Sequence, residues 1–243
     1  MSGLFNGVIM GLTLRATMSR KRALLFAVPA IILIGISALL KATATGHEWP
    51  PVVLGQIGYL VLALTALIIG GSVLGAEIED GSIVHLLATP VSRRTVVLSK
   101  YVIAVALTVA FAAVPEYLAG AIATGASSKL AIGLFVGALA GSVIYNALFV
   151  MLTAVFSPSR ALAFGLLYVL LWEGLLAGLV PGVGLLSAGH YSLAVANSIA
   201  HNSDLHANLT AGTGIGMGLV VTAVALVVAV NRLSGFSLKG DVA

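Results

Sequence analysis

Six long apolar stretches constrain this chain more than any other feature of its sequence. They run approximately over residues 23–40, 52–76, 101–123, 130–156, 161–180 and 211–230. A helix needs roughly 20 apolar residues to cross the hydrocarbon core of a bilayer, where no water is present to bond the backbone. The sequence therefore predicts an all-α, polytopic membrane protein with six transmembrane helices.

The composition excludes a soluble domain. Hydrophobic residues make up 60% of the 243 residues and charged residues only 8%, whereas a soluble domain carries about a quarter charged residues. The formal net charge of +4 does not indicate nucleic-acid binding, because the basic residues lie in short connections between apolar stretches and not on one solvated face. The absence of cysteine excludes thiol nucleophiles and thiolate metal sites.

The distribution of basic residues predicts which side of the membrane each connection faces. Lys and Arg are retained on the cytoplasmic side, and an orientation with both termini cytoplasmic leaves only Lys41 and Lys129 outside. The other ten are then inside: Arg15, Arg20, Lys21, Arg22, Arg93, Arg94, Lys100, Arg160, Arg232 and Lys239. A cleaved signal peptide is the alternative for the first stretch, since Ala42-Thr43-Ala44 imitates a cleavage site, but the stretch is longer than a signal h-region.

Two segments outside the six stretches also have helical features. In residues 1–22, apolar residues recur at helical spacing and a basic cluster follows, which predicts an interfacial amphipathic helix. A disordered tail is the alternative, because Gly7 and Gly11 weaken a helix. In the external segment 181–208, residues 191–200 are apolar but too few to span, so we expect a re-entrant-like or interfacial helix there.

Glycines recur at helical spacing in the fourth stretch. Gly133, Gly137 and Gly141 lie four residues apart, on one helix face, where they allow another helix to approach closely. Gly174 and Gly178 repeat the pattern in the fifth stretch. These glycines indicate helix packing and carry no chemistry.

Two carboxyl groups interrupt the apolar stretches. Glu116 lies in the third and Glu173 in the fifth, and a carboxylate at membrane depth costs a few kcal/mol unless it faces the bundle interior or a wet cavity. Pro115 adds a local helix break beside Glu116. An interhelical hydrogen bond from a protonated carboxyl is the structural alternative for both. Trp172, next to Glu173, makes that glutamate the stronger functional candidate.

No catalytic or metal-binding constellation emerges from the remaining polar residues. An intramembrane protease would need a base beside its serine, yet Ser142 is in mid-stretch and every histidine falls outside the six stretches. His201, Asp204 and His206 lack a spacing that would orient them around a metal, so a solvated loop is the better interpretation. We predict no catalytic residue and no metal ligand.

The connection between the second and third stretches, residues 77–94, has the most specific pattern. Acidic residues precede Ser82, a candidate helix N-cap, and an apolar stripe then leads to Pro90 and two arginines. This order predicts a short amphipathic helix on the cytoplasmic face. The acidic cluster and the helix that follows it include Glu77, Glu79, Asp80, Gly81, Ser82, Ile83, Leu86 and Leu87.

This pattern resembles the permeases of type-2 ATP-binding-cassette (ABC-2) exporters. The resemblance extends over the interfacial helix, the six spans and the external segment, although only residues 77–100 are motif-specific. It implies that residues 1–243 form a single transmembrane permease domain and that 77–94 is a coupling helix. The eight residues above would then contact a cytoplasmic ATPase subunit. From their position in apolar spans, and not from the resemblance, we expect Glu116, Trp172 and Glu173 to line a transport cavity.

The resemblance also implies partners. No Gly-x-x-x-x-Gly-Lys-Ser/Thr loop occurs in the chain, so ATP and Mg²⁺ would be bound by two copies of a separate ATPase subunit and no cofactor by this chain. A second permease subunit, identical or different, and membrane lipid would complete the assembly. We expect an exporter of hydrophobic or amphipathic cargo (a drug, natural product or lipid) in the bacterial plasma membrane. An ion-coupled secondary transporter using Glu116 and Glu173, and a membrane scaffold without cargo, are the alternatives.

Overall fold

A computed structural model of the chain describes residues 5–43, 49–79, 81, 91–179, 182–205 and 209–235, apart from the side chains of residues 20, 21 and 178. These residues form helices and no strand. The elements are α1 (Gly7–Thr17), α2 (Arg20–Thr43), α3 (Trp49–Glu79), α5 (Arg93–Thr108), η1 (Val109–Ala113), α6 (Val114–Thr124), α7 (Lys129–Val155), α8 (Pro158–Leu167), η2 (Tyr168–Leu176), α9 (Ala177–Leu179), η3 (Val183–Leu186), α10 (Ala188–Ala200), η4 (Ser203–Leu205) and α11 (Ala211–Ser234).

Among the residues that the structure describes, six helical stretches are long and apolar enough to cross a membrane: Arg22–Thr43, Trp49–Glu79, Arg93–Thr124, Lys129–Val155, Pro158–Leu176 and Ala211–Ser234. The prediction of an all-α polytopic fold with six spans is therefore confirmed. The third span begins at Arg93, eight residues earlier than the apolar stretch, because Ser92 caps it by accepting the Thr95 N–H at 3.2 Å. Lys100 consequently belongs to the helix.

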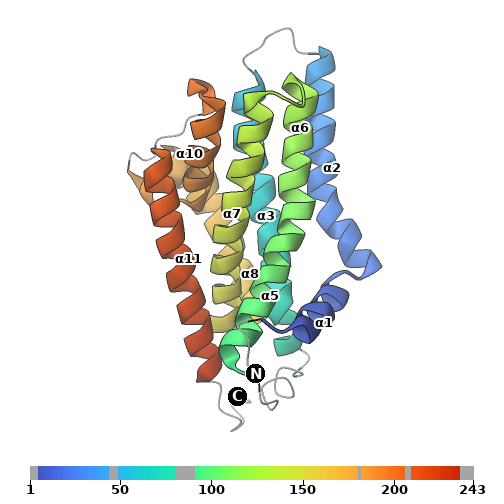
Figure 1. Ribbon diagram of the computed structural model, residues 1–243, viewed down its shortest axis with the longest axis vertical. Coiled ribbons are helices and arrows are strands. Elements are labelled where there is room, and N and C mark those ends of the chain that lie inside the picture. The colour runs from blue at the N-terminus through green and yellow to red at the C-terminus, as the bar shows by residue number, and fades with distance from the viewer. Residues whose placement is uncertain are drawn as a thin grey trace.

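Hydroxyl side chains cap the N-termini of several helices. Ser128 caps α7 by accepting the Ala131 N–H at 3.1 Å, and Thr210 caps α11 through the Thr213 N–H at 3.3 Å. These bonds satisfy backbone donors that have no partner within the helix. Pro29 lies inside α2, where it removes one backbone bond, and Figure 1 shows that α2 bends in its lower part.

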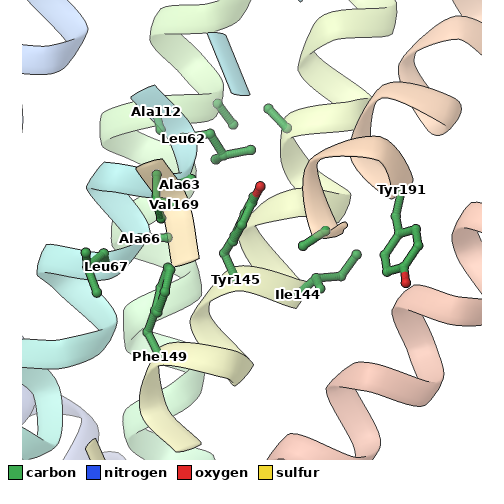
Figure 2. Packing of buried hydrophobic residues seen from close by; sticks show 13 residues of the cluster. Leu62, Ala63, Ala66, Leu67, Ala112, Ile144, Tyr145, Phe149, Val169 and Tyr191 are labelled. Atoms are coloured by element: carbon green, nitrogen blue, oxygen red, sulfur yellow. The ribbon is translucent and has the colours of Figure 1, made fainter. Parts of the chain in front are cut away.

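The helices form one elongated bundle (Figure 1). The central helix α7 lies between α3 and α11, and α1 crosses the end of the bundle where α11 finishes, which we call the α1 end. Figure 2 shows Tyr145 and Phe149 of α7 beside Leu62 and Ala66 of α3 in one of the buried apolar clusters. The two α7 rings stack with their centroids 5.9 Å apart.

The short helix α10 packs against the glycine strip of α7. A Cβ atom added to Gly133 would lie 2.6 Å from the Ala196 carbonyl oxygen, and one added to Gly137 would lie 2.7 Å from the Ser192 carbonyl oxygen. At Gly141 it would lie 2.6 Å from a methyl carbon of Leu62 and 3.0 Å from the Ser192 hydroxyl oxygen. Only glycine allows α10 and α3 this close to α7.

The segment 181–208 therefore contains a helix, α10, that lies beside the half of α7 away from the α1 end rather than beyond it (Figure 1). Its re-entrant-like or interfacial position in the membrane stays a prediction. The fifth span differs from the fourth, because Gly174 is exposed and a Cβ there would meet only the Val169 carbonyl oxygen of the same helical stretch among the described residues.

Two π-helical stretches widen the spans near the two glutamates. In η1 the Val114 N–H donates to the Val109 carbonyl, five residues back, directly before Pro115. Proline lacks an N–H and its ring would clash with the carbonyl four residues earlier, and a wider turn relieves that clash. In η2 the Ala177 N–H donates in the same way to the Trp172 carbonyl.

Candidate functional site

Glu173 is buried, with 2% of its surface exposed, and both of its carboxylate oxygens accept hydrogen bonds. The Tyr168 hydroxyl donates to Oε1 at 2.6 Å, and the Ser187 hydroxyl donates to Oε2. The Gly189 N–H lies 3.3 Å from each oxygen. The carboxyl group therefore joins the fifth span to the beginning of α10.

The π-helical backbone of η2 creates part of this arrangement. Residues five apart point about 140° away from each other in an α-helix, whereas a π-helix bonds i to i+5 and stacks them on one face. Tyr168 and Glu173 are five apart, and η2 brings their side chains into contact. The Tyr168 hydroxyl also accepts the Ala188 N–H at 3.3 Å.

The N-terminus of α10 is polar and is fixed by hydrogen bonds of Ser187. Ser187 caps the helix by accepting the His190 N–H at 3.1 Å, and its hydroxyl lies 2.9 Å from His190 Nδ1. A negative charge next to a helix N-terminus is favoured by the helix dipole, which suits the position of Glu173. Burial lowers the pKa of His190, and the nearby Glu173 carboxylate opposes that shift by raising it.

Two further tyrosines surround this carboxyl group. Tyr59 of α3 donates to the Glu173 backbone carbonyl at 3.3 Å. A Cβ atom at Gly189 would lie 2.9 Å from Glu173 Oε2 and 3.1 Å from both the Tyr145 hydroxyl oxygen and Tyr59 Cδ2. Glycine is thus required at position 189 for α10 to approach α3 and α7.

Trp172 joins the same two parts of the chain. Its indole Nε1 donates to the Leu186 carbonyl at 3.2 Å, so Trp172 and Glu173 both connect η2 to the residues just before α10. The structure thus gives both residues a role in helix docking. Their predicted place at a transport cavity stays a prediction.

Glu116 has a different environment. It is also buried, with 4% exposed, but its Oε2 atom has no hydrogen-bond partner among the described residues. A Cβ atom at Gly58 of α3 would lie 2.6 Å from Glu116 Oε1. The carboxyl group of Glu116 therefore occupies the space that this glycine leaves between α6 and α3.

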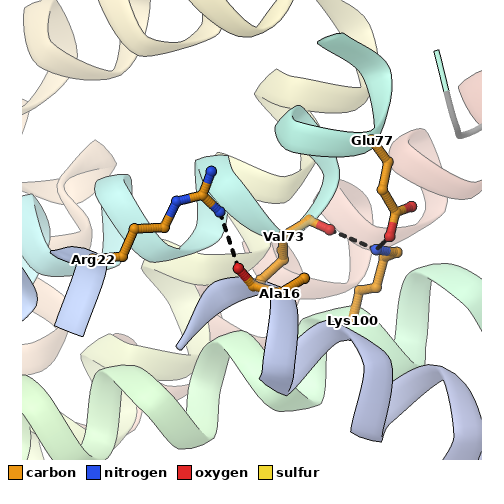
Figure 3. Close-up of polar contacts among 5 residues, drawn as sticks. All are labelled: Ala16, Arg22, Val73, Glu77 and Lys100. Carbon is orange, nitrogen blue, oxygen red and sulfur yellow. Dashed lines mark hydrogen bonds and ion pairs between the residues drawn. The ribbon is translucent and has the colours of Figure 1, made fainter. Parts of the chain in front are cut away.

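At the α1 end, a partly buried ion pair joins the second and third spans (Figure 3). Lys100 Nζ lies 2.5 Å from Glu77 Oε1 and donates to the Val73 carbonyl at 2.7 Å. Lys100 is 1% exposed and Glu77 29%. The Ser99 hydroxyl oxygen accepts the Asn6 N–H at 3.0 Å, which attaches the start of α1 to the same place.

The predicted coupling segment is described only at its two ends. Glu77 and Glu79 belong to the last turn of α3, and residues 93 and 94 begin α5, so a separate helix has only residues 80–92 available. Gly81 follows α3 with φ of +69°, a left-handed conformation typical of a residue that ends a helix. Asp80, Ser82, Ile83, Leu86 and Leu87 lie outside the described residues.

Comparison with known families identifies the type of protein. A family described as "ABC-2 family transporter protein" matches residues 18–182, which is more than half of the chain. The chain belongs to this family. No curated protein matches it.

Members of the ABC-2 family are membrane components that are generally not catalytic themselves, and the family implies an ATPase partner. In this permease the matched region contains the first five spans, the connection between the second and third, and both buried glutamates. The resemblance inferred from residues 77–100 is therefore confirmed at the level of the family.

The permease also contains a cavity of about 240 Å³ near the α1 end. It lies between α2, α3, α7 and α8, has mostly apolar walls, and carries Arg22 and Glu79 at its edge. Arg22 is further bound to the Ala16 carbonyl at 3.2 Å (Figure 3). Other residues of the wall are Phe26, Leu67, Gly71, Gly75, Phe149, Thr153 and Leu162.

Sequence reasoning missed this cavity and the polar partners of Glu173. The Lys100–Glu77 pair had a usable signal, since opposite charges at the two ends of one connection meet when the flanking helices run antiparallel. The contact of Tyr168 with Glu173 had no signal in the sequence, because it depends on a π-helical stretch that contains no proline to indicate it.

Proposed function

We propose that this ABC-2 permease is the membrane subunit of an exporter that moves a hydrophobic or amphipathic cargo with ATP hydrolysed by a separate cassette subunit. The match of residues 18–182 to the ABC-2 family carries the proposal, and the six spans support it. ATP and Mg²⁺ are bound by the partner ATPase in this proposal, because the chain has no phosphate-binding loop. We propose two copies of that subunit.

We place the ATPase contact at residues 77–94. Glu77, Glu79 and Gly81 contribute from the α3 side, and Asp80, Ser82, Ile83, Leu86 and Leu87 complete the segment. The Lys100–Glu77 ion pair supports a mechanical role, because a push on this connection would move α3 and α5 together. Lys100 is the buried member of the pair, so separation from Glu77 would leave its charge without compensation.

A second permease subunit, identical or different, completes the assembly in this proposal, with the cargo pathway beside the second and fifth spans. The fifth span supports this, because many of its large apolar side chains are exposed in the single chain: Leu162, Phe164, Leu166, Leu167, Leu170, Leu171 and Leu175. Membrane lipid would cover what the second subunit leaves free. Glu116, Trp172 and Glu173 are kept as cavity candidates.

The α1 end faces the cytoplasm in this proposal, and the membrane is the bacterial plasma membrane. Arg93, Arg160 and Arg232 begin or end spans at the α1 end, whereas Lys41 and Lys129 mark the opposite end. This separation is what the retention of positive charge in the cytoplasm predicts. Both termini would then be cytoplasmic.

The test is co-purification of the tagged permease, followed by identification of the attached soluble subunit. The double variant E79K/D80K should release or uncouple that subunit, because it reverses the charge of the proposed contact. Asp204→Lys, on the opposite side of the molecule, is the matched control and should retain it. Retention of the ATPase with unchanged coupled activity in E79K/D80K would contradict the contact, and cargo movement by the permease alone with an ion gradient would favour the secondary transporter.

A further inference from the structure

Glu116 is a buried carboxyl group that the proposed function does not explain. Eight residues separate it from Thr124, the last residue of α6, so it lies about 12 Å inside the end of the span along the helix axis. The Ala119 side chain, one turn further on, belongs to an apolar cluster with Leu33 and Leu54. The surroundings of Glu116 thus resemble hydrocarbon more than water.

In the part of the chain that the structure describes, no ion pair balances a charge at this position. The one ion pair among the described residues is that of Lys100 with Glu77. Tyr117, on the same helix, donates to the Ala126 carbonyl, and Lys41 of α2 donates to the Ile122 carbonyl. The other titratable groups on elements packed against α6 are those of Arg20, Lys21 and Arg22 on α2, Tyr59, Glu77 and Glu79 on α3, and Lys129 and Tyr145 on α7.

None of these groups bonds Glu116 in the described part of the chain. Tyr59 bonds Glu173, and the charged groups of α3 lie at the α1 end. An unpaired carboxylate in such surroundings is costly. A proton removes the charge and turns one oxygen into a hydroxyl group, so these surroundings favour the neutral carboxyl group.

The surroundings also allow that proton to leave. The π-helical stretch η1 and Pro115 interrupt the regular helix directly before Glu116, and such stretches occur frequently at functional sites. Gly58 is the contact of Glu116 on the other side. It belongs to α3, one continuous helix that ends at Glu79 beside the proposed ATPase contact. A displacement of α3 at the α1 end therefore reaches Gly58.

We propose that Glu116 is a proton-binding site, occupied in the conformation described here, which releases its proton when α3 moves away from α6. The step is the transfer of the carboxyl proton to a water molecule that enters between the two helices, leaving a carboxylate and a hydronium ion. The proton returns when the helices close. The permease would thus exchange one proton per protomer during its cycle, an activity beyond the proposed export function.

Infrared spectroscopy of the purified permease in lipid nanodiscs tests the site without its partner. At neutral pH the wild type should show the carbonyl-stretching band of a protonated carboxylic acid, which carboxylates and carboxamides lack. Glu116→Gln should abolish this band, and the matched variant Glu173→Gln should keep it. A missing band in the wild type, or a band that persists in Glu116→Gln, overturns the site. If Glu116→Gln does not assemble, Glu116→Asp should shift the band, and an unshifted band overturns the assignment.

Exchange is tested on the permease with its co-purified ATPase. Addition of ATP should lower the acid band, and the effect should disappear in E79K/D80K. A band that ATP leaves unchanged while hydrolysis proceeds shows a static proton and overturns the exchange. The proposed function stands or falls separately, since it depends on ATPase association and cargo transport and not on this band.

Discussion

Glu173 and Glu116 are the same residue type in similar sequence surroundings, yet their carboxyl groups have opposite environments. Each interrupts an apolar span and each lies in or directly beside a π-helical stretch. The oxygens of Glu173 are bonded to Tyr168, Ser187 and Gly189, whereas Glu116 Oε2 has no partner among the described residues.

The difference comes from what the chain brings opposite each carboxyl group. Fourteen residues after Glu173, Ser187 begins a helix whose first N–H groups need acceptors. Opposite Glu116, α3 presents Gly58, which has no side chain that could donate a hydrogen bond. A carboxyl group in a span can therefore attach one helix to another or hold a proton, depending on the donors that tertiary packing supplies. Substitutions of the two glutamates and of the glycines beside them would break or sharpen this comparison.

Glu173→Leu should have the largest effect. It leaves the hydroxyl groups of Tyr168 and Ser187 and the Gly189 N–H without their acceptor, and each unpaired buried donor costs about 1–3 kcal/mol. We expect a loss of at least about 3 kcal/mol in the free energy of unfolding, measured by denaturant titration in detergent micelles. Stability equal to that of the wild type would refute the docking role.

The transport role predicted for Glu173 separates from docking in Glu173→Gln. That variant retains an acceptor oxygen and the volume but has no charge. Loss of cargo-stimulated ATPase activity in an assembled complex would support the cavity role. Normal transport would leave docking as the role of this side chain.

Substitutions that crowd the two carboxyl groups should have the next largest effect on stability. Gly58→Ala and Gly189→Ala both place a methyl group too close to a glutamate oxygen, at 2.6 and 2.9 Å, and overpacking of this kind costs about 1–3 kcal/mol. Truncating Glu116 to Ala should relieve Gly58→Ala, because Oε2 of that side chain has no hydrogen bond to lose among the described residues. Truncating Glu173 should not relieve Gly189→Ala, since it breaks the docking network.

A double-mutant cycle on each pair measures this difference. Gly35→Ala is the control, because nothing lies within 4 Å of a Cβ added there. Equal relief in the two cycles would show that the two carboxyl groups do not differ in the way their contacts indicate.

The sequence predicted the spans well and the polar contacts poorly, for physical reasons. Span positions follow from apolar length alone, a local property. The start of the third span was placed eight residues too late, because Lys100 resembled a solvated connection, and its burial depends on Glu77. The closeness of α10 to Gly133 and Gly137 followed from helical spacing, but which helix would fill the space did not.

The hydrogen-bond partners of Glu173 depend on two features that the sequence does not predict. One is the π-helical stretch that aligns Tyr168 with Glu173, and the other is the return of Ser187 to the same depth as η2. For Glu116, the neighbouring Pro115 correctly predicted an irregularity in the helix. The lack of a hydrogen-bond partner for Glu116 Oε2 among the described residues, however, depends on how α6 packs against its neighbouring helices and not on any short segment.

The smallest effect should be that of Glu116→Gln on stability. A neutral carboxyl group and a carboxamide have nearly the same shape, and replacing one by the other here breaks no hydrogen bond to Oε2, since none is present in the described part of the chain. We therefore expect a change below about 1 kcal/mol in the free energy of unfolding at neutral pH, compared in the same detergent with Glu173→Gln. The latter should be the more destabilised variant, because its new amide hydrogens face the donors of Ser187 and Gly189. If Glu116→Gln proves the more destabilised of the two, Glu116 contributes a bonded or charged group to the fold, and the contrast between the two carboxyl groups is wrong.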